Sequence, residues 1–318
     1  MKNILWVCCF MILLPLVSRA QMKNTVSEVR EYKEVDGKII ITCLVNSVEA
    51  DFVLDLAGQT AILPEYVEKF NIDTTEKAKI PYDCFQYKNI PTFRSVSLNS
   101  ISFGNNAFAN GLGAFVLKDE PYLRELGVAG IVGGAIFQRV VLTIDSQRKK
   151  LTMSQPYRPS YMKLTNRANA QLLQGVGMEC PITIDGVTFS CMLDTWNKGL
   201  VELNATDFAR LTGTAGKNVQ VYAGYGKTLV MVPAKVVGQC DFVRMAFKDV
   251  SIAENKSLIR SVIGTEILKH GLLSVDFLRQ TIYFQPFDEV TVKDDVIENH
   301  VTVESGKVNE ITGVYFRE

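Results

Sequence analysis

Short apolar runs separated by polar turn residues recur along most of this chain, and this pattern predicts β-strands. Residues 39–45 and 48–54 are two such runs on either side of Asn46-Ser47, a turn dipeptide. Other runs that predict strands fall at 95–103, 111–117, 140–145, 150–153, 176–184, 187–193, 218–221, 229–232 and 243–247. Two apolar-periodic segments, 63–70 with Pro64 near its start and 203–211, predict short helices. The pattern therefore predicts an all-β chain with a few short helices.

Two of the apolar runs end in an acid. Phe52-Val53-Leu54 leads into Asp55, and Cys191-Met192-Leu193 leads into Asp194. An ionised carboxylate at the end of a buried strand is unfavourable unless it has a partner or a raised pKa. We therefore predict that the two acids face each other and share a proton, an arrangement that supports general acid and base chemistry on water.

The chain also contains an internal duplication. Residues 131–153 align without a gap on residues 262–284, and this places Asp145 over Asp276. A duplicated half with one acid each implies pseudo-two-fold symmetry, which brings equivalent residues face to face across an axis. Asp145 and Asp276 precede expected hairpin turns, where we predict that they accept hydrogen bonds within the turn.

With these motifs the sequence resembles the pepsin and retropepsin-like aspartic proteases, in which each half has an apolar-apolar-Asp-Thr/Ser-Gly turn and a closing apolar-apolar-Gly segment. The matching segments are residues 54–58 and 193–197 for the turns, and 131–133 and 262–264 for the closing segments. The resemblance extends over residues 38–286 and especially to exported bacterial members with both lobes in one chain. It implies an all-β, bilobal fold of duplicated β-barrel lobes, with a first lobe at 38–158 and a second lobe at 159–286. Residues 21–37 are polar and predict a frayed lead-in, and residues 287–318 form a C-terminal extension.

The resemblance implies that Asp55 and Asp194 form a catalytic dyad, supported by loop residues Leu56, Ala57, Gly58, Thr195 and Trp196. It also implies an extended peptide or protein substrate and no metal or organic cofactor. The loops depart from the family pattern: Leu56 stands at the hydroxyl position of the first half, and Ala57 and Trp196 stand at the glycine positions. We predict that the Trp196 side chain lies near the place of the substrate carbonyl or the attacking water.

Two functions remain open. One is an exported endopeptidase that uses the Asp55/Asp194 dyad, and the other is an inactive homologue that binds a peptide or a glycan. The glycine-rich segment Tyr222, Gly224, Tyr225 and Gly226 is a candidate for a mobile flap over the cleft. The corresponding region of the first half, near residues 82–91, has no glycine.

The cysteines predict one candidate disulfide. Asp185-Gly186 is a two-residue hairpin signal, and counting outwards from it places Cys180 opposite Cys191, close enough for a bond. The alternative is two buried free thiols. No C-x-x-C pair is present and the chain has only two histidines, so the sequence argues against a zinc site.

The N-terminus predicts export. Lys2, an apolar run at 4–17 and Ser18-Arg19-Ala20 form the pattern of a signal peptide over residues 1–20, which directs the chain to the periplasm or the cell exterior. The apolar run is too short to span a bilayer comfortably, so we expect no membrane span after cleavage. Lys plus Arg and Asp plus Glu both number 34, which argues against nucleic acid as a partner. A monomer is expected because both lobes lie in one chain.

Overall fold

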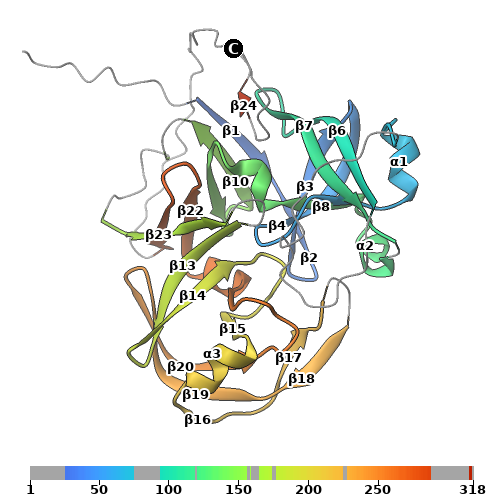
Figure 1. The fold of residues 1–318 in the computed structure, drawn as a ribbon. Coiled ribbons are helices and arrows are strands. Elements are labelled where there is room, and N and C mark those ends of the chain that lie inside the picture. The colour runs from blue at the N-terminus through green and yellow to red at the C-terminus, as the bar shows by residue number, and fades with distance from the viewer. Residues whose placement is uncertain are drawn as a thin grey trace, which may run out of the picture.

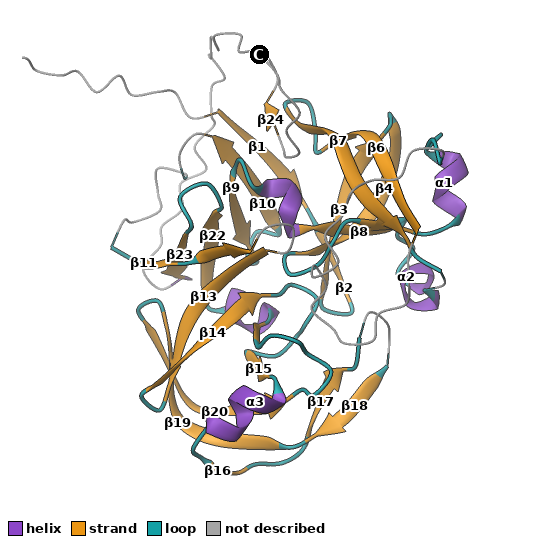
Figure 2. Cartoon of the chain, viewed as in Figure 1, coloured by secondary structure: helices purple, strands orange, loops and turns teal. Residues whose placement is uncertain are grey.

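The computed structural model describes residues 26–74, 94–118, 120–155, 158, 165–173, 177–224, 228–287 and 315–316. These residues form two β-rich lobes, one above the other in Figure 1, which meet along a shared region of sheet. Short helices lie at the periphery and beside the sheets, as Figure 2 shows. They are α1 (Glu65–Lys69), α2 (Pro121–Glu125), α3 (Ala205–Arg210) and the 3₁₀ turns η1 (Gly134–Phe137) and η2 (Thr265–Lys269). The fold is all-β with two duplicated lobes, as the sequence predicts.

Each lobe is built on one large sheet. The first contains β2 (Lys33–Val35), β3 (Lys38–Val45), β4 (Val48–Asp55), β5 (Ala61–Ile62), β6 (Arg94–Ser102), β7 (Ala107–Val116), β8 (Gly130–Gly133) and β24 (Tyr315–Phe316). The second contains β12 (Gln171–Leu173), β13 (Gly177–Ile184), β14 (Val187–Leu193), β15 (Val201–Leu203), β16 (Thr214–Ala215), β19 (Ala234–Phe242), β20 (Met245–Glu254) and β21 (Val262–Ile263). A separate hairpin of the second lobe is formed by β17 (Val219–Tyr222) and β18 (Leu229–Val232).

A six-stranded antiparallel sheet joins the lobes. Its order is β1 (Val26–Glu31), β10 (Lys150–Gln155), β9 (Val141–Asp145), β22 (Gly271–Asp276), β23 (Thr281–Pro286) and β11 (Arg167–Asn169). The lead-in at 21–37, which we expected to be polar and frayed, instead contributes β1 to this sheet and β2 to the first lobe. The expectation was wrong for the described part of this segment, because backbone pairing with β10 and β3 orders a sequence that has little apolar character of its own.

The duplication is visible as symmetry at the centre of the shared sheet. Strands β9 and β22, one from each half, pair antiparallel there. Thr143 and Ser274, which are 131 residues apart in the sequence, share a buried hydrogen bond between their hydroxyl groups. This separation equals the offset of the sequence repeat, so equivalent residues meet face to face as predicted.

The turn acids repeat in the same way. Asp145 accepts a hydrogen bond from the backbone N–H of Arg148 at 3.0 Å, and Asp276 accepts one from the backbone N–H of Arg279 at 2.9 Å. Each arginine side chain also contacts its acid, at 3.2 Å and 3.1 Å. The predicted role of these two acids in hairpin turns is confirmed.

The strand order around the two acids is the same in both lobes. β4, which ends in Asp55, runs parallel to β8, and β14, which precedes Asp194, runs parallel to β21. The glycines that close β8 and follow β21 lie against the acid loops. A Cβ atom on Gly133 would lie 2.4 Å from the carbonyl oxygen of Gly58, and one on Gly264 would lie 2.3 Å from that of Gly199. The apolar-apolar-Gly segments therefore need glycine because two backbones pass in contact.

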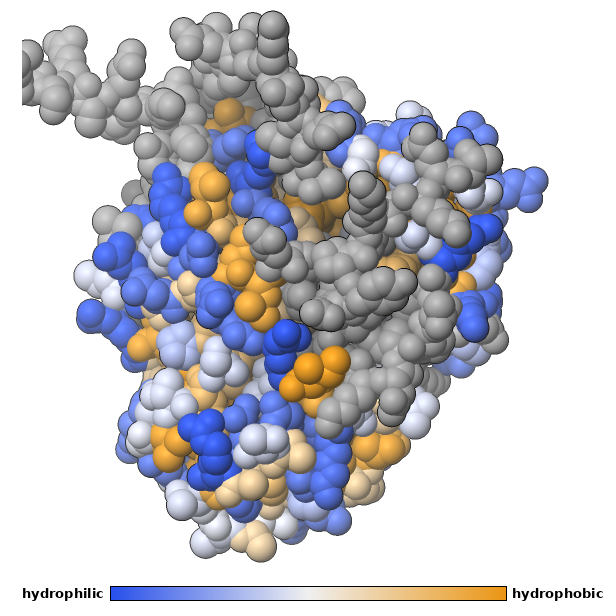
Figure 3. Space-filling view, in the orientation of Figure 1, coloured by the Kyte–Doolittle hydropathy of each residue, from blue (hydrophilic) through white to orange (hydrophobic). Residues whose placement is uncertain are grey.

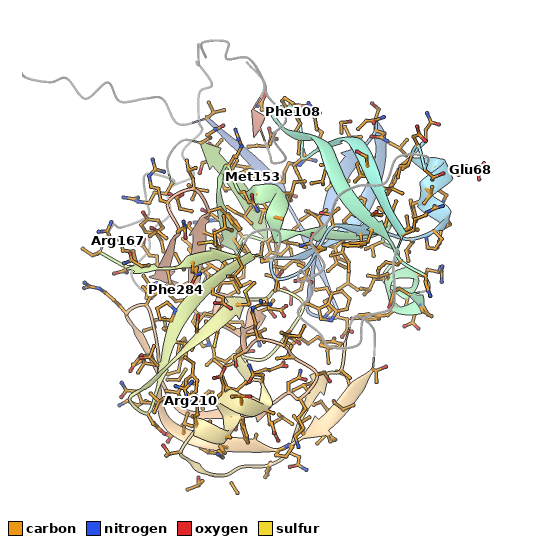
Figure 4. All side chains as sticks on the ribbon, in the orientation of Figure 1. Glu68, Phe108, Met153, Arg167, Arg210 and Phe284 are labelled. Carbon is orange, nitrogen blue, oxygen red and sulfur yellow. The ribbon has the colours of Figure 1, made fainter. Side chains whose placement is uncertain are left out.

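The core is formed by the inward faces of these sheets. Met153 and Phe284, on repeat-equivalent strands of the shared sheet, are at most 1% exposed, whereas Glu68 and Arg210 lie at the periphery in Figure 4. Figure 3 shows polar residues over much of the described surface on this face, with apolar residues in separate small groups. Within the described part of the chain, no helix has the length and apolar character that crossing a membrane would require.

The hairpin that carries the candidate disulfide has the predicted register. Cys180 lies opposite Cys191, and the turn residues Asp185 and Gly186 both have positive φ, 44° and 81°. Both cysteines are buried and are free thiols in the structure, so the predicted bond is not formed there. Burial raises the pKa of both thiols, which disfavours the thiolate form that disulfide exchange requires.

The backbone contact at the second closing segment gives a stability prediction. Replacing Gly264 with Ala forces a methyl group against the carbonyl oxygens of Gly199 and Asn197, and we expect the free energy of unfolding to fall by about 3 kcal/mol. Gly224→Ala is the matched control, because a Cβ there meets no atom within 4 Å, and we expect no loss of stability. Denaturant unfolding measures both variants, and equal stabilities would contradict the predicted contact.

Candidate functional site

The two acid loops meet at the junction of the lobes. The Thr195 hydroxyl donates a hydrogen bond to the carbonyl oxygen of Leu54 at 2.6 Å and accepts one from the backbone N–H of Leu56 at 3.0 Å. Leu54 and Leu56 flank Asp55, and Thr195 directly follows Asp194. One hydroxyl therefore ties the two loops together. The tie is made from one side only, because the first half has Leu56 where the second half has Thr195.

Both acids are buried, with Asp55 1% and Asp194 2% exposed. Asp55 Oδ1 accepts a hydrogen bond from the backbone N–H of Ala57 at 3.0 Å. Asp194 Oδ1 accepts hydrogen bonds from the backbone N–H groups of Trp196 at 2.7 Å and Asn197 at 3.2 Å, and its Oδ2 accepts one from the Asn197 side-chain amide at 2.8 Å. Burial raises the pKa of Asp194, and these donors oppose the increase by stabilising the carboxylate.

A lysine that the sequence analysis did not single out lies beside the acid loop of the second lobe. Lys38, the first residue of β3, is fully buried, and its ammonium group donates a hydrogen bond to the carbonyl oxygen of Trp196. The ammonium attracts the carboxylates of Asp194 and Asp55. Burial nevertheless lowers the pKa of Lys38 to about 7, because desolvation of the cation outweighs this attraction.

Aromatic rings surround the Lys38 ammonium. Its Nζ atom lies 3.7 Å from the ring centroid of Tyr222 and 4.6 Å from that of Trp196. The Trp196 ring makes edge contacts with Tyr122 at 6.0 Å and with Tyr222 at 6.2 Å between centroids. Trp196 is 1% exposed and Tyr222 2%. The Trp196 indole therefore packs at the junction between a residue of the first lobe and one of the second, at the position where the family has glycine.

Hydrogen bonds of the exposed β2–β3 turn join the two lobes beside the buried residues Lys38 and Trp196. Asp36, in the turn between β2 and β3, contacts Lys198 of the second acid loop at 2.6 Å and accepts a hydrogen bond from the Tyr122 hydroxyl at 2.6 Å. These hydrogen bonds, first that from Lys198, lower the pKa of Asp36. Gly37 has a φ of 70° and packs on the Lys198 side chain. In Figure 1 the β2–β3 turn accordingly extends from the first lobe towards the second.

A further buried acid, Glu202, lies on β15 of the second lobe. The carboxylate of Glu202 accepts a hydrogen bond from the Asn255 amide at 2.7 Å, and the same amide donates to the carbonyl oxygen of Tyr222 at 3.0 Å. Burial raises the pKa of Glu202 to about 7. This chain of hydrogen bonds fixes the backbone of Tyr222, whose ring covers Lys38.

The structure brings the predicted residues of the two acid loops together at the junction of the lobes. The adjoining loops carry Asp55, Leu56 and Ala57 from the first half and Asp194, Thr195 and Trp196 from the second. The backbone N–H of Gly58 donates to the carbonyl oxygen of Asp55 at 3.2 Å. Of the flap candidates, Tyr222 is buried in the site and Gly224 follows in a bend, while Tyr225, Gly226 and the first-half region 82–91 lie outside the described residues. Within the described part of the chain, no three His, Cys, Asp or Glu side chains gather in a way that could hold a metal ion.

Sequence reasoning missed Lys38, Tyr122, Lys198 and Glu202. A signal existed for Lys38, since it follows Asp36-Gly37, a hairpin dipeptide, and begins an otherwise apolar strand. It is also separated from Gly177 by the same 139 residues that separate Leu56 from Thr195. Gly177 packs on the carbonyl of Leu56, whereas Lys38 reaches the carbonyl of Trp196. The two halves therefore differ in charge and size at this equivalent pair.

The tie between the loops gives a second stability prediction. Thr195→Val keeps the shape of the side chain but leaves the buried carbonyl of Leu54 and N–H of Leu56 without this partner. We expect the free energy of unfolding to fall by about 2–4 kcal/mol. The control is Thr188→Val, at an exposed position near the start of β14, where we expect a change within about 0.5 kcal/mol. Urea unfolding of both variants measures the difference, and a Thr195 variant as stable as the control would show that the tie contributes nothing.

Comparison with known proteins finds similarity to solved structures only. No protein-family model matches the chain, and no curated protein matches it. Among solved structures, the chain is similar to the crystal structure of a retropepsin-like aspartic protease from Rickettsia conorii, with 20% sequence identity and a TM-score of 0.30. The match covers 41% of this chain and 91% of that chain. The two duplicated β lobes, with one acid loop from each at the junction, agree with the all-β bilobal arrangement that the sequence resemblance implies.

Proposed function

We propose that this protein is a catalytically silent homologue of the aspartic proteases, which acts by binding and not by hydrolysis. The observation that carries the proposal is the closure of the acid pair. Asp55 and Asp194 are at most 2% exposed, and so are Lys38, Trp196 and Tyr222, which pack beside them. Peptide hydrolysis requires a water molecule and an extended peptide within hydrogen-bond reach of both carboxyls.

The charge of Lys38 acts against the dyad mechanism. With a pKa of about 7, Lys38 is protonated throughout the acidic range in which an acid pair would exchange protons. A cation beside two carboxyls favours the ionised form of each. The dyad mechanism requires one carboxyl to remain protonated and to donate to the substrate carbonyl. Burial, the larger effect, raises the pKa of Asp194, whereas the ammonium group of Lys38 lowers this pKa and so acts against the protonated form that hydrolysis needs.

A second candidate, a latent endopeptidase, is favoured by the hydrogen bonds around Asp194. Three donors hold this carboxylate, and Thr195 ties the loop to the partner loop. This geometry would remain if the β2–β3 turn and the Trp196 indole moved away. In that case Asp55 and Asp194 would form the working dyad, with an extended peptide as substrate.

Cleavage of a denatured protein between about pH 3 and pH 7 tests the proposal. We expect the wild-type chain to cleave no more than its Asp55→Asn variant, because both acids are buried and an extended peptide does not reach them. Wild-type cleavage that Asp55→Asn abolishes would refute catalytic silence.

The double variant Lys38→Ala/Trp196→Gly, with and without Asp55→Asn, separates the two candidates. If the chain is silent, opening the site in this way yields no cleavage that depends on Asp55. Cleavage that appears in the double variant and disappears with Asp55→Asn would establish the latent endopeptidase instead. Circular dichroism of each variant confirms that the fold is retained before cleavage is compared.

We propose further that the chain is exported to the periplasm or the cell exterior, on the basis of the signal-peptide pattern over residues 1–20, which lie outside the described residues. When the full chain is expressed in a bacterium, we expect N-terminal sequencing of the exported protein to begin at Gln21. Leu13→Arg, which interrupts the apolar run, should leave Met1 in place and the protein in the cytoplasm. A wild-type chain recovered there with Met1 intact would exclude export.

A further inference from the structure

We propose that the space bounded by the Trp196 carbonyl and the rings of Tyr222 and Trp196, beside the acid loops, is a binding site for a primary alkylammonium group, which Lys38 fills from within the same chain. A free alkylamine of matching size should enter this site when the Lys38 side chain is shortened. The proposal does not depend on whether the acids catalyse hydrolysis, because it concerns the recognition of a cation.

The first argument is charge. Lys38 is the only lysine or arginine that is fully buried among the described residues, and its attraction extends to Asp194, Asp55 and Glu202. A buried ammonium is tolerated only where charges and acceptors compensate for its lost hydration. The carbonyl oxygen of Trp196 supplies the direct acceptor.

The second argument is shape and selectivity. The rings of Tyr222 and Trp196, at 3.7 Å and 4.6 Å from Nζ, provide the electron-rich faces that attract a cation and not a neutral polar group. Tyr122 supports both rings from the first lobe, at centroid distances of 6.4 Å and 6.0 Å. Aromatic faces around a cation are an arrangement by which proteins recognise organic ammonium ions.

The third argument is that the site is built from both lobes. Lys38 begins strand β3 of the first lobe, but its ammonium bonds to the acid loop of the second. The turn that delivers it is anchored separately, by the Asp36 contacts to Lys198 and Tyr122. Shortening Lys38 therefore removes the occupant and leaves these outer contacts in place.

Lys38→Ala removes three methylene groups and the ammonium, which together correspond to n-propylammonium. We expect this variant to melt at a lower temperature than the wild type, and n-propylammonium chloride to raise its melting temperature saturably by about 2–4 °C. Sodium chloride at equal ionic strength and n-propanol at equal concentration should not do so, since one lacks the alkyl chain and the other the charge.

Two control variants define specificity. Lys38→Met fills the space without a charge, so n-propylammonium should produce no saturable shift. Lys198→Ala removes a neighbouring lysine whose side chain is 43% exposed, and we again expect no shift specific to n-propylammonium. Trp196 fluorescence, with Trp6 replaced by Phe so that one tryptophan remains, should change on n-propylammonium addition only in the Lys38→Ala background.

The proposal is overturned if Lys38→Ala responds equally to n-propylammonium and to sodium chloride, or if Lys38→Met responds as strongly as Lys38→Ala. If Lys38→Ala is recovered unfolded, refolding in the same three solutes replaces the melting experiment. Recovery of folded protein in n-propylammonium alone supports the site, and equal recovery, or none, in all three solutes overturns it.

Discussion

Buried charge at the junction of the lobes is the constraint on which this structure depends. Two strands deliver carboxylates into the interior, where each ion loses most of its hydration. The protein compensates with backbone N–H groups at Asp55 and Asp194, a side-chain amide at Asp194 and the ammonium of Lys38. The ammonium of Lys38 comes from the first lobe and attracts Asp194 of the second, while Thr195 of the second lobe bonds the loop that carries Asp55. The same interactions that satisfy the acids therefore hold the lobes together.

The two duplicated halves are equivalent in their strand pairing and hairpin turns but differ in the residues around the acids. Thr143 and Ser274 meet on the pseudo-axis, and the turns at Asp145 and Asp276 repeat the same contacts. Around the acids this equivalence is lost. Thr195 ties the loops from one side, and Lys38 occupies the position that corresponds to Gly177. Symmetry is retained where strands pair, whereas it is lost where a substrate would have to enter.

The departures from the aspartic protease pattern act together in space. Trp196 places a large ring at a glycine position, and Tyr122 and Tyr222 pack on it from opposite lobes. Lys38 then lies against these rings and the carbonyl of Trp196. A buried aromatic cluster and a buried cation stabilise each other through the ring faces. The junction around the acids is therefore filled by packed side chains.

The sequence by itself predicted many of the strands, the hairpin turns, the repeat and the two acids, because these follow from apolar periodicity and local turn chemistry. Asn46-Ser47 and Asp185-Gly186 adopt positive φ at the predicted hairpins, and Cys180 faces Cys191 in the predicted register. Only the tertiary structure decided what surrounds the acids. Lys38 is remote in sequence from Trp196 and Tyr222, and a charged residue after a turn is usually solvated. Its burial results from the meeting of two lobes, which no local pattern encodes, and the same is true of the pairing that orders β1 against β10.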